Sequence, residues 1–317
     1  ISLGLSQSLL TALEQENITT PYPIQTQAIP AILENRDILG IAKTGSGKTL
    51  SYVLPILMDL QKGKVLKNRH IQVLVVVPTR ELAAQVNSVF IKFINQASLD
   101  LKTLAAFGGA SINPQMMGMR NVNILIATPG RLLELASVNA VHFSAVETVV
   151  LDEADKMLTA GFAKEMNQIF ALLPKVRQNL LFSATLNEEI QTLENLLLDN
   201  PLVIRIDEES NPIDLINQSA YSISQEQKGP LLRYLIKSKN MEQVLVFTSS
   251  IARADRVADK LRKNGIAAKA IHSRKTQGAR TDLLQSFKEG KLRVLVATDL
   301  LSRGIDIEFL PFVVNYE

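Results

Sequence analysis

Short apolar runs alternate with amphipathic segments along most of the chain. In the first two thirds, runs of strand length lie at residues 37–41, 72–77, 104–107, 123–127, 148–151, 179–182 and 201–206. Between these runs, apolar residues recur every three or four positions, as at Leu82, Val86 and Phe93, which is the spacing of a helix with one buried face. The alternation predicts strands joined by helices, and therefore a mostly parallel, doubly wound α/β sheet.

The alternation is interrupted once and then resumes. Residues 207–212 are polar. Beyond them we predict strands at 218–222, 243–247, 267–271, 292–297 and 312–315, with helices at 229–237 and 277–287 and another that ends near 265. We therefore expect two α/β domains of similar layout, at residues 1–207 and 217–317, joined by a linker at 208–216.

Composition agrees with a folded two-domain protein and narrows its chemistry. Of the 317 residues 46% are hydrophobic and 21% charged, and the formal net charge is +3, which permits a polyanionic partner without requiring one. The chain has no cysteine, which excludes disulfides, zinc–thiolate sites and cysteine nucleophiles. No apolar run approaches the roughly 20 residues of a membrane span. We expect a soluble, cytoplasmic monomer with no membrane association.

The most specific local signal lies between the first predicted strand and the helix that follows it. It consists of Ala42, Lys43, Thr44, Gly45, Ser46, Gly47, Lys48 and Thr49. Glycines let successive backbone N–H groups point inward at a helix N-terminus and hold an anion. In such a loop Lys48 would bridge the β- and γ-phosphates of a nucleotide, and the Thr49 hydroxyl would bind Mg²⁺. Ala42 replaces the usual first glycine, and a functionless glycine-rich turn is the alternative.

A second signal is the apolar run Val149–Leu151, which leads directly into Asp152, Glu153 and Asp155. In open parallel sheets ligands bind beyond the carboxyl ends of the strands, where Asp152 and Glu153 could hold a metal ion and a reacting water. Taken alone, the stretch is better explained as a solvated turn in which Asp155 caps the next helix. The predicted phosphate loop favours the functional interpretation, because it would hold the phosphates on which these carboxylates could act.

Most of the other predicted strands also end in polar or glycine residues. These endings are 78–81, 108–109, 128–131 and 183–185 in the first domain, and 248–249, 272 and 298–299 in the second. We therefore predict one extended site along one sheet edge of the first domain. Two endings have purely structural alternatives: Thr128 before Pro129 fits a helix N-cap, and Thr185 with Glu188 fits a capping box.

Taken together, the chain resembles the DEAD-box RNA helicases over essentially its whole length. The naming motif is Asp152-Glu153-Ala154-Asp155, and segments 78–85, 108–109, 128–131, 183–185, 277–280 and 303–306 match the family's other motifs in its order. The resemblance implies two RecA-like domains that close around ATP, Mg²⁺ and one RNA strand, in an RNA-stimulated ATPase that locally unwinds short duplexes. The alternatives are an ATP-gated RNA clamp or scaffold without productive unwinding, and a small-molecule ATPase that is indifferent to RNA.

The resemblance also implies residue roles. ATP would be bound by Gln25, which reads adenine, by the octet Ala42–Thr49, and by Asp306, which takes the ribose hydroxyls. Asp152, Glu153 and Lys48 would be catalytic: Asp152 shares Mg²⁺ with Thr49, and Glu153 orients and deprotonates the attacking water. RNA would be bound by Arg80, Gly109, Thr128, Arg131, Gln277, Arg280 and Thr298. Coupling between the ATP and RNA sites would rest on Asp155, Ser183, Thr185 and Arg303.

Two further features shape these expectations. The chain has no tryptophan and only 5% aromatic residues, so base-stacking platforms are scarce, and we expect recognition of the RNA backbone. The sequence ends at Glu317, before the family's arginine-rich segment, whose arginine finger is worth roughly 10³–10⁵ in kcat. We therefore expect the second domain to be incomplete, ATP hydrolysis to be slow without that segment, and protein partners to bind through segments outside this chain.

Overall fold

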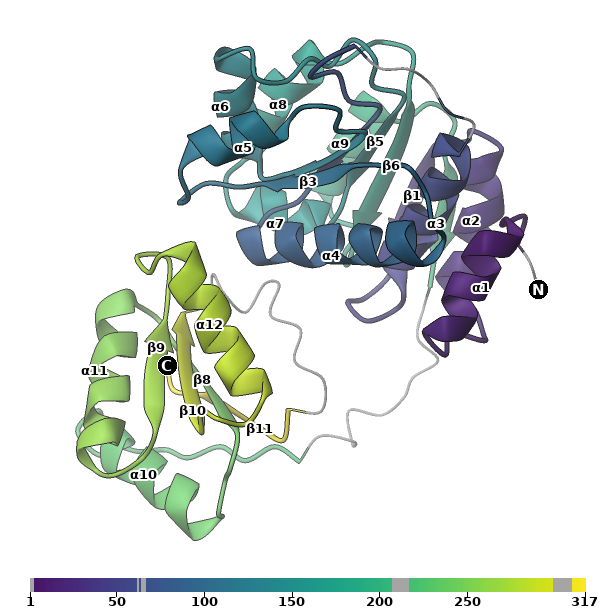
Figure 1. The fold of residues 1–317 in the computed structure, drawn as a ribbon. Coiled ribbons are helices and arrows are strands. Elements are labelled where there is room, and N and C mark those ends of the chain that lie inside the picture. The colour runs from purple at the N-terminus through teal and green to yellow at the C-terminus, as the bar shows by residue number, and fades with distance from the viewer. Residues whose placement is uncertain (1–2, 62, 64–66, 207–216, 299–309) are drawn as a thin grey trace. The chain divides into compact units, whose positions relative to one another are not determined.

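The structure, a computed structural model, describes residues 3–61, 63, 67–206, 217–298 and 310–317. The chain divides into two compact units, Ile1–Glu209 and Ser210–Glu317, and each contains a parallel sheet flanked by helices (Figure 1). The two predicted α/β domains are confirmed. The residues of the predicted linker, 208–216, lie outside the described part of the chain. Within that part, no helix is long and apolar enough to cross a membrane.

The first unit is built on a seven-stranded sheet whose strand order is β3-β4-β2-β5-β6-β1-β7. The strands are β1 (Ile38–Ile41), β2 (Val73–Val76), β3 (Thr103–Ala106), β4 (Ile124–Ala127), β5 (Thr148–Leu151), β6 (Gln178–Ser183) and β7 (Leu202–Arg205). Every pairing is parallel. Each strand lies where an apolar run predicted one.

Helices cover both faces of this sheet. They are α1 (Gln7–Gln15), α2 (Pro23–Leu33), α3 (Lys48–Leu60), α4 (Arg80–Gln96), α5 (Ile112–Gly118), α6 (Pro129–Ser137), α7 (Ala154–Thr159), α8 (Ala163–Leu172) and α9 (Glu188–Leu197). Successive residues of a strand point to opposite faces: in β2, Val75 packs with α3 and α4, and Leu74 packs with α6 and α8. Because both faces of the inner strands β2, β4 and β5 are buried, these strands are largely apolar rather than alternating.

Strands β1 and β6 approach each other closely at one glycine. Gly40 of β1 must lack a side chain, because a Cβ there would lie 2.6 Å from the ring of Phe182.

Helix α9 begins after Asn187, whose side chain accepts the Ile190 N–H at 2.9 Å. The capping box of Thr185 with Glu188 is therefore wrong. Asp155 lies inside the first turn of α7, whose N-cap is residue 153, so the capping role considered for Asp155 is wrong too.

The second unit has a four-stranded parallel sheet in the order β11-β8-β10-β9. Its strands are β8 (Val244–Thr248), β9 (Ala268–Ile271), β10 (Val294–Thr298) and β11 (Phe312–Asn315), and its helices are α10 (Lys228–Ser238), α11 (Ile251–Lys263) and α12 (Gln277–Lys288). The strand predicted at 218–222 is wrong: these residues are exposed and form no strand. Ala220 and Tyr221 are the apolar residues there, and Tyr221 is 50% exposed, so no apolar face is buried to hold a strand.

Candidate active site

Parallel strands place all the chemically distinctive loops of the first unit at one sheet edge. Strands β1, β6 and β5 are neighbours, so the octet Ala42–Thr49, the segment 183–185 and the carboxylates of 152–155 emerge side by side. Strands β2, β4 and β3 are also neighbours, and they carry Arg80, Thr128 with Arg131, and Gly109. The edge therefore has two halves, a phosphate-loop half and an arginine half, which meet where β5 pairs with β2.

The phosphate loop has the backbone that its glycines predict. Gly45 and Gly47 have φ angles of 86° and 85°, in the left-handed region that side chains disfavour. A Cβ on Gly47 would also lie 2.6 Å from Gln25 Nε2, so a larger residue is excluded twice. The loop is tied to the sheet by the Ala42 N–H, which donates to the Ser183 carbonyl at 3.0 Å. The first N–H groups of α3 face this loop, as an anion site requires.

Lys48 places a buried positive charge inside the loop. Its side chain is 7% exposed, and its ammonium donates to the Ala42 carbonyl and, at 2.9 Å, to the Lys43 carbonyl. Burial lowers the pKa of Lys48, and the charges of Asp152 and Glu153 oppose that shift. The arrangement fits a polyphosphate, because an anion would replace solvation that the buried ammonium has lost.

Asp152 is a buried carboxyl with both oxygens hydrogen-bonded. Oδ2 accepts the Tyr52 hydroxyl at 2.8 Å, and Oδ1 accepts the Glu153 N–H at 2.9 Å. Burial raises the pKa of Asp152 to about 6, against the Tyr52 hydrogen bond and the charge of Lys48. A nearby cation stabilises the charged form of a buried carboxylate. Lys48 supplies one such cation, and the site also fits a metal ion.

Glu153 has one oxygen paired and one left over. Its Oε1 accepts from Lys156 Nζ at 2.6 Å, whereas Oε2 is buried and has no hydrogen-bond partner within the described ranges. The residue adopts a left-handed backbone, with φ 54° and ψ 47°, which is uncommon for a side chain with a Cβ and is concentrated at functional sites. A buried acceptor without a donor fits a group that orients water.

The donor set suits magnesium rather than a closed metal cage. Among the residues that the structure describes, no three His, Asp or Glu side chains gather around one point. Mg²⁺ usually keeps several waters and binds one or two carboxylates together with substrate phosphates. Asp152 and the Thr49 hydroxyl, beside the phosphate loop, fit that requirement.

The raised pKa of Asp152 predicts that Asp152→Asn stabilises the protein in Mg²⁺-free buffer at neutral pH. An asparagine could accept the Glu153 N–H and donate to the Tyr52 oxygen, so both hydrogen bonds have a replacement. The folded carboxyl holds its proton up to about pH 6, whereas an unfolded aspartic acid releases it near 3.9. Wild-type stability should therefore fall as the pH rises through that window.

The expected gain for Asp152→Asn is about 1–3 kcal/mol above pH 7 and close to zero below about pH 4. Urea-induced unfolding of the two proteins at both pH values measures it. A gain of the same size at both pH values would show that a change other than ionisation causes it.

Three of the predicted coupling residues lie close together: Ser183 bonds Thr185, and Asp155 bonds Ala184 between them. Asp155 Oδ1 accepts the Ala184 N–H at 3.4 Å, Ser183 Oγ donates to the Thr185 carbonyl at 2.7 Å, and the Thr185 N–H lies 3.3 Å from Ser183 Oγ. Ser183 is fully buried, whereas Thr185 is exposed. Any shift of the carboxylate segment would therefore move the exposed end of segment 183–185.

In the arginine half of the edge, two arginine side chains contact the backbone of the loop at residues 109–110. The Arg80 guanidinium lies over Gly109, where a Cβ would come within 1.9 Å of Nη1. Arg131 is 5% exposed and bonds Glu134 through Nε at 2.7 Å and the Ala110 carbonyl through Nη2 at 2.8 Å, while its Nη1 has no hydrogen-bond partner in the described ranges. Thr128 is buried at the start of α6 and makes no side-chain cap. Arg131 thus fixes the loop that carries Gly109.

The predicted residues of the second unit lie at the carboxyl edge of its own sheet. Gln277 and Arg280 lie in the first turn of α12, which follows β9, and Thr298 ends the neighbouring strand β10. Arg280 is 5% exposed, and Gln277 Oε1 is buried without a hydrogen-bond partner among the residues described. Arg303 and Asp306 lie outside the described residues.

Gln25 binds the phosphate loop in the structure, and its contact with adenine stays a prediction. Its Oε1 accepts the Tyr22 N–H at 2.9 Å, and its Nε2 donates to the Gly47 carbonyl at 3.1 Å. Gln25 also lines a cavity of about 400 Å³ between α1 and α2. The carboxamide therefore clamps the phosphate loop, and contact with adenine would have to share or replace one of these two bonds.

Sequence reasoning missed two residues that touch the carboxylates. Tyr52 donates to Asp152 and Lys156 pairs with Glu153. A tyrosine inside an apolar helix generally needs a partner for its hydroxyl, but the sequence does not say which partner. Lys156 lies three residues after Glu153, and that spacing pairs charges only if the chain is already helical there.

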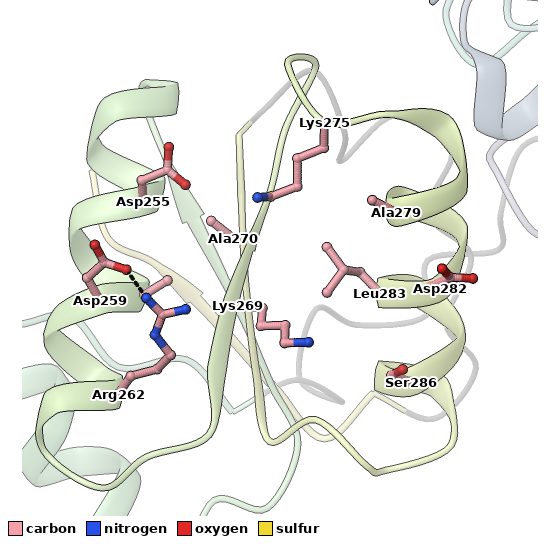
Figure 2. A pocket seen from close by; sticks show the side chains of 11 residues that line it. Asp255, Asp259, Arg262, Lys269, Ala270, Lys275, Ala279, Asp282, Leu283 and Ser286 are labelled. Atoms are coloured by element: carbon pink, nitrogen blue, oxygen red, sulfur yellow. Dashed lines mark hydrogen bonds and ion pairs between the residues drawn. The ribbon is translucent and has the colours of Figure 1, made fainter. Parts of the chain in front are cut away.

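A charged groove in the second unit contains none of the predicted residues. Lys269 and Ala270 are consecutive in β9, the last strand of the described sheet, and both line this cavity of about 420 Å³ (Figure 2). Consecutive residues of a strand point to opposite faces of the sheet. A groove lined by both must therefore run along the edge of β9 that pairs with no other described strand. Asp255 and Asp259 of α11 line one side and Asp282 of α12 the other. Charges at an exposed edge hinder pairing with another chain, so we interpret the groove as a protected edge.

Comparison with known proteins gives an independent view of the whole chain. Residues 22–193 match the family model of the DEAD/DEAH box helicase, and residues 227–317 match that of the helicase conserved C-terminal domain. The chain is 34% identical to the DEAD-box ATP-dependent RNA helicase CshA of Geobacillus kaustophilus, with 99% of this chain and 66% of that protein covered. It is 37% identical to RhpA of Helicobacter pylori, with 99% and 63% covered. It thus spans roughly two thirds of these curated relatives.

Solved structures agree. S. cerevisiae Dbp5 bound to RNA and ADP BeF3 matches with a TM-score of 0.87 and 26% identity, over 100% of this chain and 80% of that one. A DEAD box protein from Methanococcus jannaschii matches with a TM-score of 0.60 and 34% identity, over 99% and 84% of the two chains. The two units therefore have the RecA-like fold of these proteins.

Proposed function

This chain belongs to the DEAD-box helicase family, and from that premise we propose that it hydrolyses ATP while gripping the backbone of single-stranded RNA, and that it separates short duplexes. The observation that carries the proposal is the order of neighbouring strands in the first sheet. It puts the Lys48 ammonium, the Asp152 carboxyl and the unpartnered Glu153 oxygen at the carboxyl ends of β1 and β5, with β6 between them.

In this proposal each residue of the phosphate-loop half has a distinct task. The loop amides and Lys48 hold the phosphates, and Gln25 fixes the loop through Gly47. Asp152 and Thr49 hold Mg²⁺, which when bound neutralises charge on the phosphates. Glu153 accepts a hydrogen bond from the attacking water through Oε2 and takes its proton, while Lys156 holds Oε1 in place.

RNA contact is assigned to the arginine half of the same edge. Arg80 is half-buried over Gly109, whose exposed backbone can approach a phosphate closely because it has no side chain. Arginine side chains and glycine N–H groups bind phosphate oxygens without reading bases. The contact of Asp155 with the Ala184 N–H gives the carboxylates a path to segment 183–185. We propose that Ser183 and Thr185 transmit the state of the nucleotide along that path.

Backbone recognition predicts a steep salt dependence of RNA affinity. For single strands the slope of log K against log salt concentration is about −0.7 for each neutralised phosphate. Arg80→Ala should weaken binding equally for RNAs of different sequence and flatten the slope by about 0.7. Arg120→Ala is the matched control, because Arg120 is exposed and precedes β4 at the opposite edge of the sheet. Fluorescence anisotropy over a salt series measures both slopes, and equal slopes for wild type and Arg80→Ala would remove Arg80 from the RNA site.

The second candidate is an ATP-gated clamp that holds RNA without unwinding it. The same contacts support it, because they bind a backbone and do not by themselves separate strands. A strand-displacement assay on a short RNA duplex decides between the two. ATP-dependent release of a labelled strand supports the helicase, and RNA-stimulated hydrolysis without release supports the clamp.

A further inference from the structure

Tyr52 joins the two residues that the proposed function assigns to Mg²⁺. It lies on α3, three residues after Thr49, and its side chain is fully buried. Its hydroxyl donates to Asp152 Oδ2 at 2.8 Å, and the Thr49 side chain lies near enough to the same hydroxyl to lower the pKa of Tyr52, against the larger raising effect of burial. The hydroxyl therefore stands between a residue of the phosphate loop and a residue at the end of β5.

The ring of Tyr52 is fixed independently of its hydroxyl. It packs against Phe182 of β6, with ring centroids 5.4 Å apart, and both rings are fully buried in the same apolar cluster. An aromatic ring that is held this firmly presents its hydroxyl in one place. Strand β6 lies between β1, which leads into the phosphate loop, and β5, which leads into Asp152. The ring contact therefore fixes the hydroxyl relative to the strand that separates these two parts of the ATP site.

The hydrogen bonds of Asp152 leave its carboxyl group little freedom to rotate. Tyr52 holds Oδ2, and the Glu153 N–H holds Oδ1 from the other side. Each oxygen of a carboxylate has a second lone pair, which stays available for a metal-bound water. Without the tyrosine hydroxyl one oxygen would be released, and the plane of the carboxyl group could turn.

We propose that Tyr52 is a positioning residue of the ATPase, which holds the Asp152 carboxylate and the Thr49 hydroxyl in the fixed relation that Mg²⁺ binding requires. This inference rests on the proposed function. Tyr52 need not touch the nucleotide or the metal, and its effect passes through the two side chains that do. A hydroxyl that only satisfied the buried carboxylate would affect stability but would not affect the dependence on Mg²⁺.

The test is Tyr52→Phe, which removes one oxygen and keeps the ring. We expect the Mg²⁺ concentration for half-maximal binding of a fluorescent ADP analogue to rise at least fivefold, and kcat at saturating Mg²⁺ and ATP to fall about tenfold, the scale of a lost hydrogen bond to a charged group. Affinity for the analogue in EDTA should stay within about twofold, because the loop amides and Lys48 are untouched.

Ser51→Ala is the control that separates positioning from stability. It removes a neighbouring buried hydroxyl that donates to the Lys48 carbonyl at 2.5 Å and does not bond Asp152. This variant should lower the thermal midpoint and leave the half-maximal Mg²⁺ concentration within about twofold of wild type. Phe182→Leu keeps the tyrosine hydroxyl but removes the ring contact that holds it, so it should raise the half-maximal Mg²⁺ concentration by less than Tyr52→Phe does.

A wild-type Mg²⁺ dependence in Tyr52→Phe would overturn the inference, and so would an equal shift in Ser51→Ala. Wild-type protein whose binding of the analogue ignores Mg²⁺ would instead contradict the proposed function. The two failures are therefore distinguishable.

Discussion

Glu153→Gln is expected to reduce ATP turnover by about 10²–10⁴-fold, the usual contribution of a general base, while ATP and RNA binding stay close to wild type. Glutamine keeps the shape of the side chain and can still accept a hydrogen bond, but it cannot take a proton from water. The affected oxygen is buried and has no hydrogen-bond partner in the described part of the chain, so its loss of charge removes no internal hydrogen bond from the protein.

The matched control for this prediction is Glu189→Gln, which removes the same charge from an exposed site in the first turn of α9. Steady-state phosphate release and equilibrium binding of a fluorescent ATP analogue separate turnover from affinity. Because the ion pair with Lys156 is also weakened, a small loss of stability is expected and thermal unfolding should accompany the assay. Turnover within tenfold of wild type would remove Glu153 from the role of general base.

Lys48→Ala is expected to weaken nucleotide binding by about 10²–10³-fold, the effect of removing one partner from a buried charge pair. The ammonium is held inside the loop by the Ala42 and Lys43 carbonyls, and it is the buried positive charge facing Asp152 and Glu153. Its removal takes away the phosphate ligand and the positive charge that faces Asp152, while Glu153 keeps its ion pair with Lys156.

Lys175→Ala controls for the loss of one positive charge, because Lys175 is exposed between α8 and β6. Isothermal titration with ADP in the presence of Mg²⁺ gives the affinities. An affinity for Lys48→Ala within about threefold of wild type would show that the octet does not bind phosphate through this lysine.

The sheet was predictable because it is buried on both faces. Residues such as Leu74 and Val75 are apolar irrespective of the face to which they point, so strand-length apolar runs marked every strand of the first unit. The parallel order of the strands also follows from the helices between them. It is the reason why loops as distant in sequence as Ala42 and Ser183 could be expected at one edge, where the structure joins them by a hydrogen bond.

The strand at 218–222 shows the limit of propensity. Its apolar residues, Ala220 and Tyr221, are adjacent and exposed, and no described part of the second unit buries them, so burial outweighs the local pattern. The predicted N-cap of α9 was wrong for a different reason. Thr185 and Asn187 are both good caps, and the backbone turn after β6, rather than the side chains, decides which one begins the helix.

The sequence also could not give the partners of buried polar atoms. The bonds of the Gln25 carboxamide to Tyr22 and Gly47 were not foreseen, and its contact with adenine stays a prediction. The bond between Tyr52 and Asp152 joins residues a hundred positions apart. Such contacts depend on the register and tilt of packed elements, which hydrophobic periodicity does not encode.

We propose that one sheet edge of the first unit serves both ATP and RNA. The most direct measurement is the rate of ATP hydrolysis by this protein with and without a short single-stranded RNA, at low salt and saturating Mg²⁺. We expect that RNA raises the rate in wild-type protein, that Arg80→Ala reduces this stimulation, and that Glu153→Gln hydrolyses ATP too slowly for stimulation to be seen. A wild-type rate that does not change with RNA would contradict it.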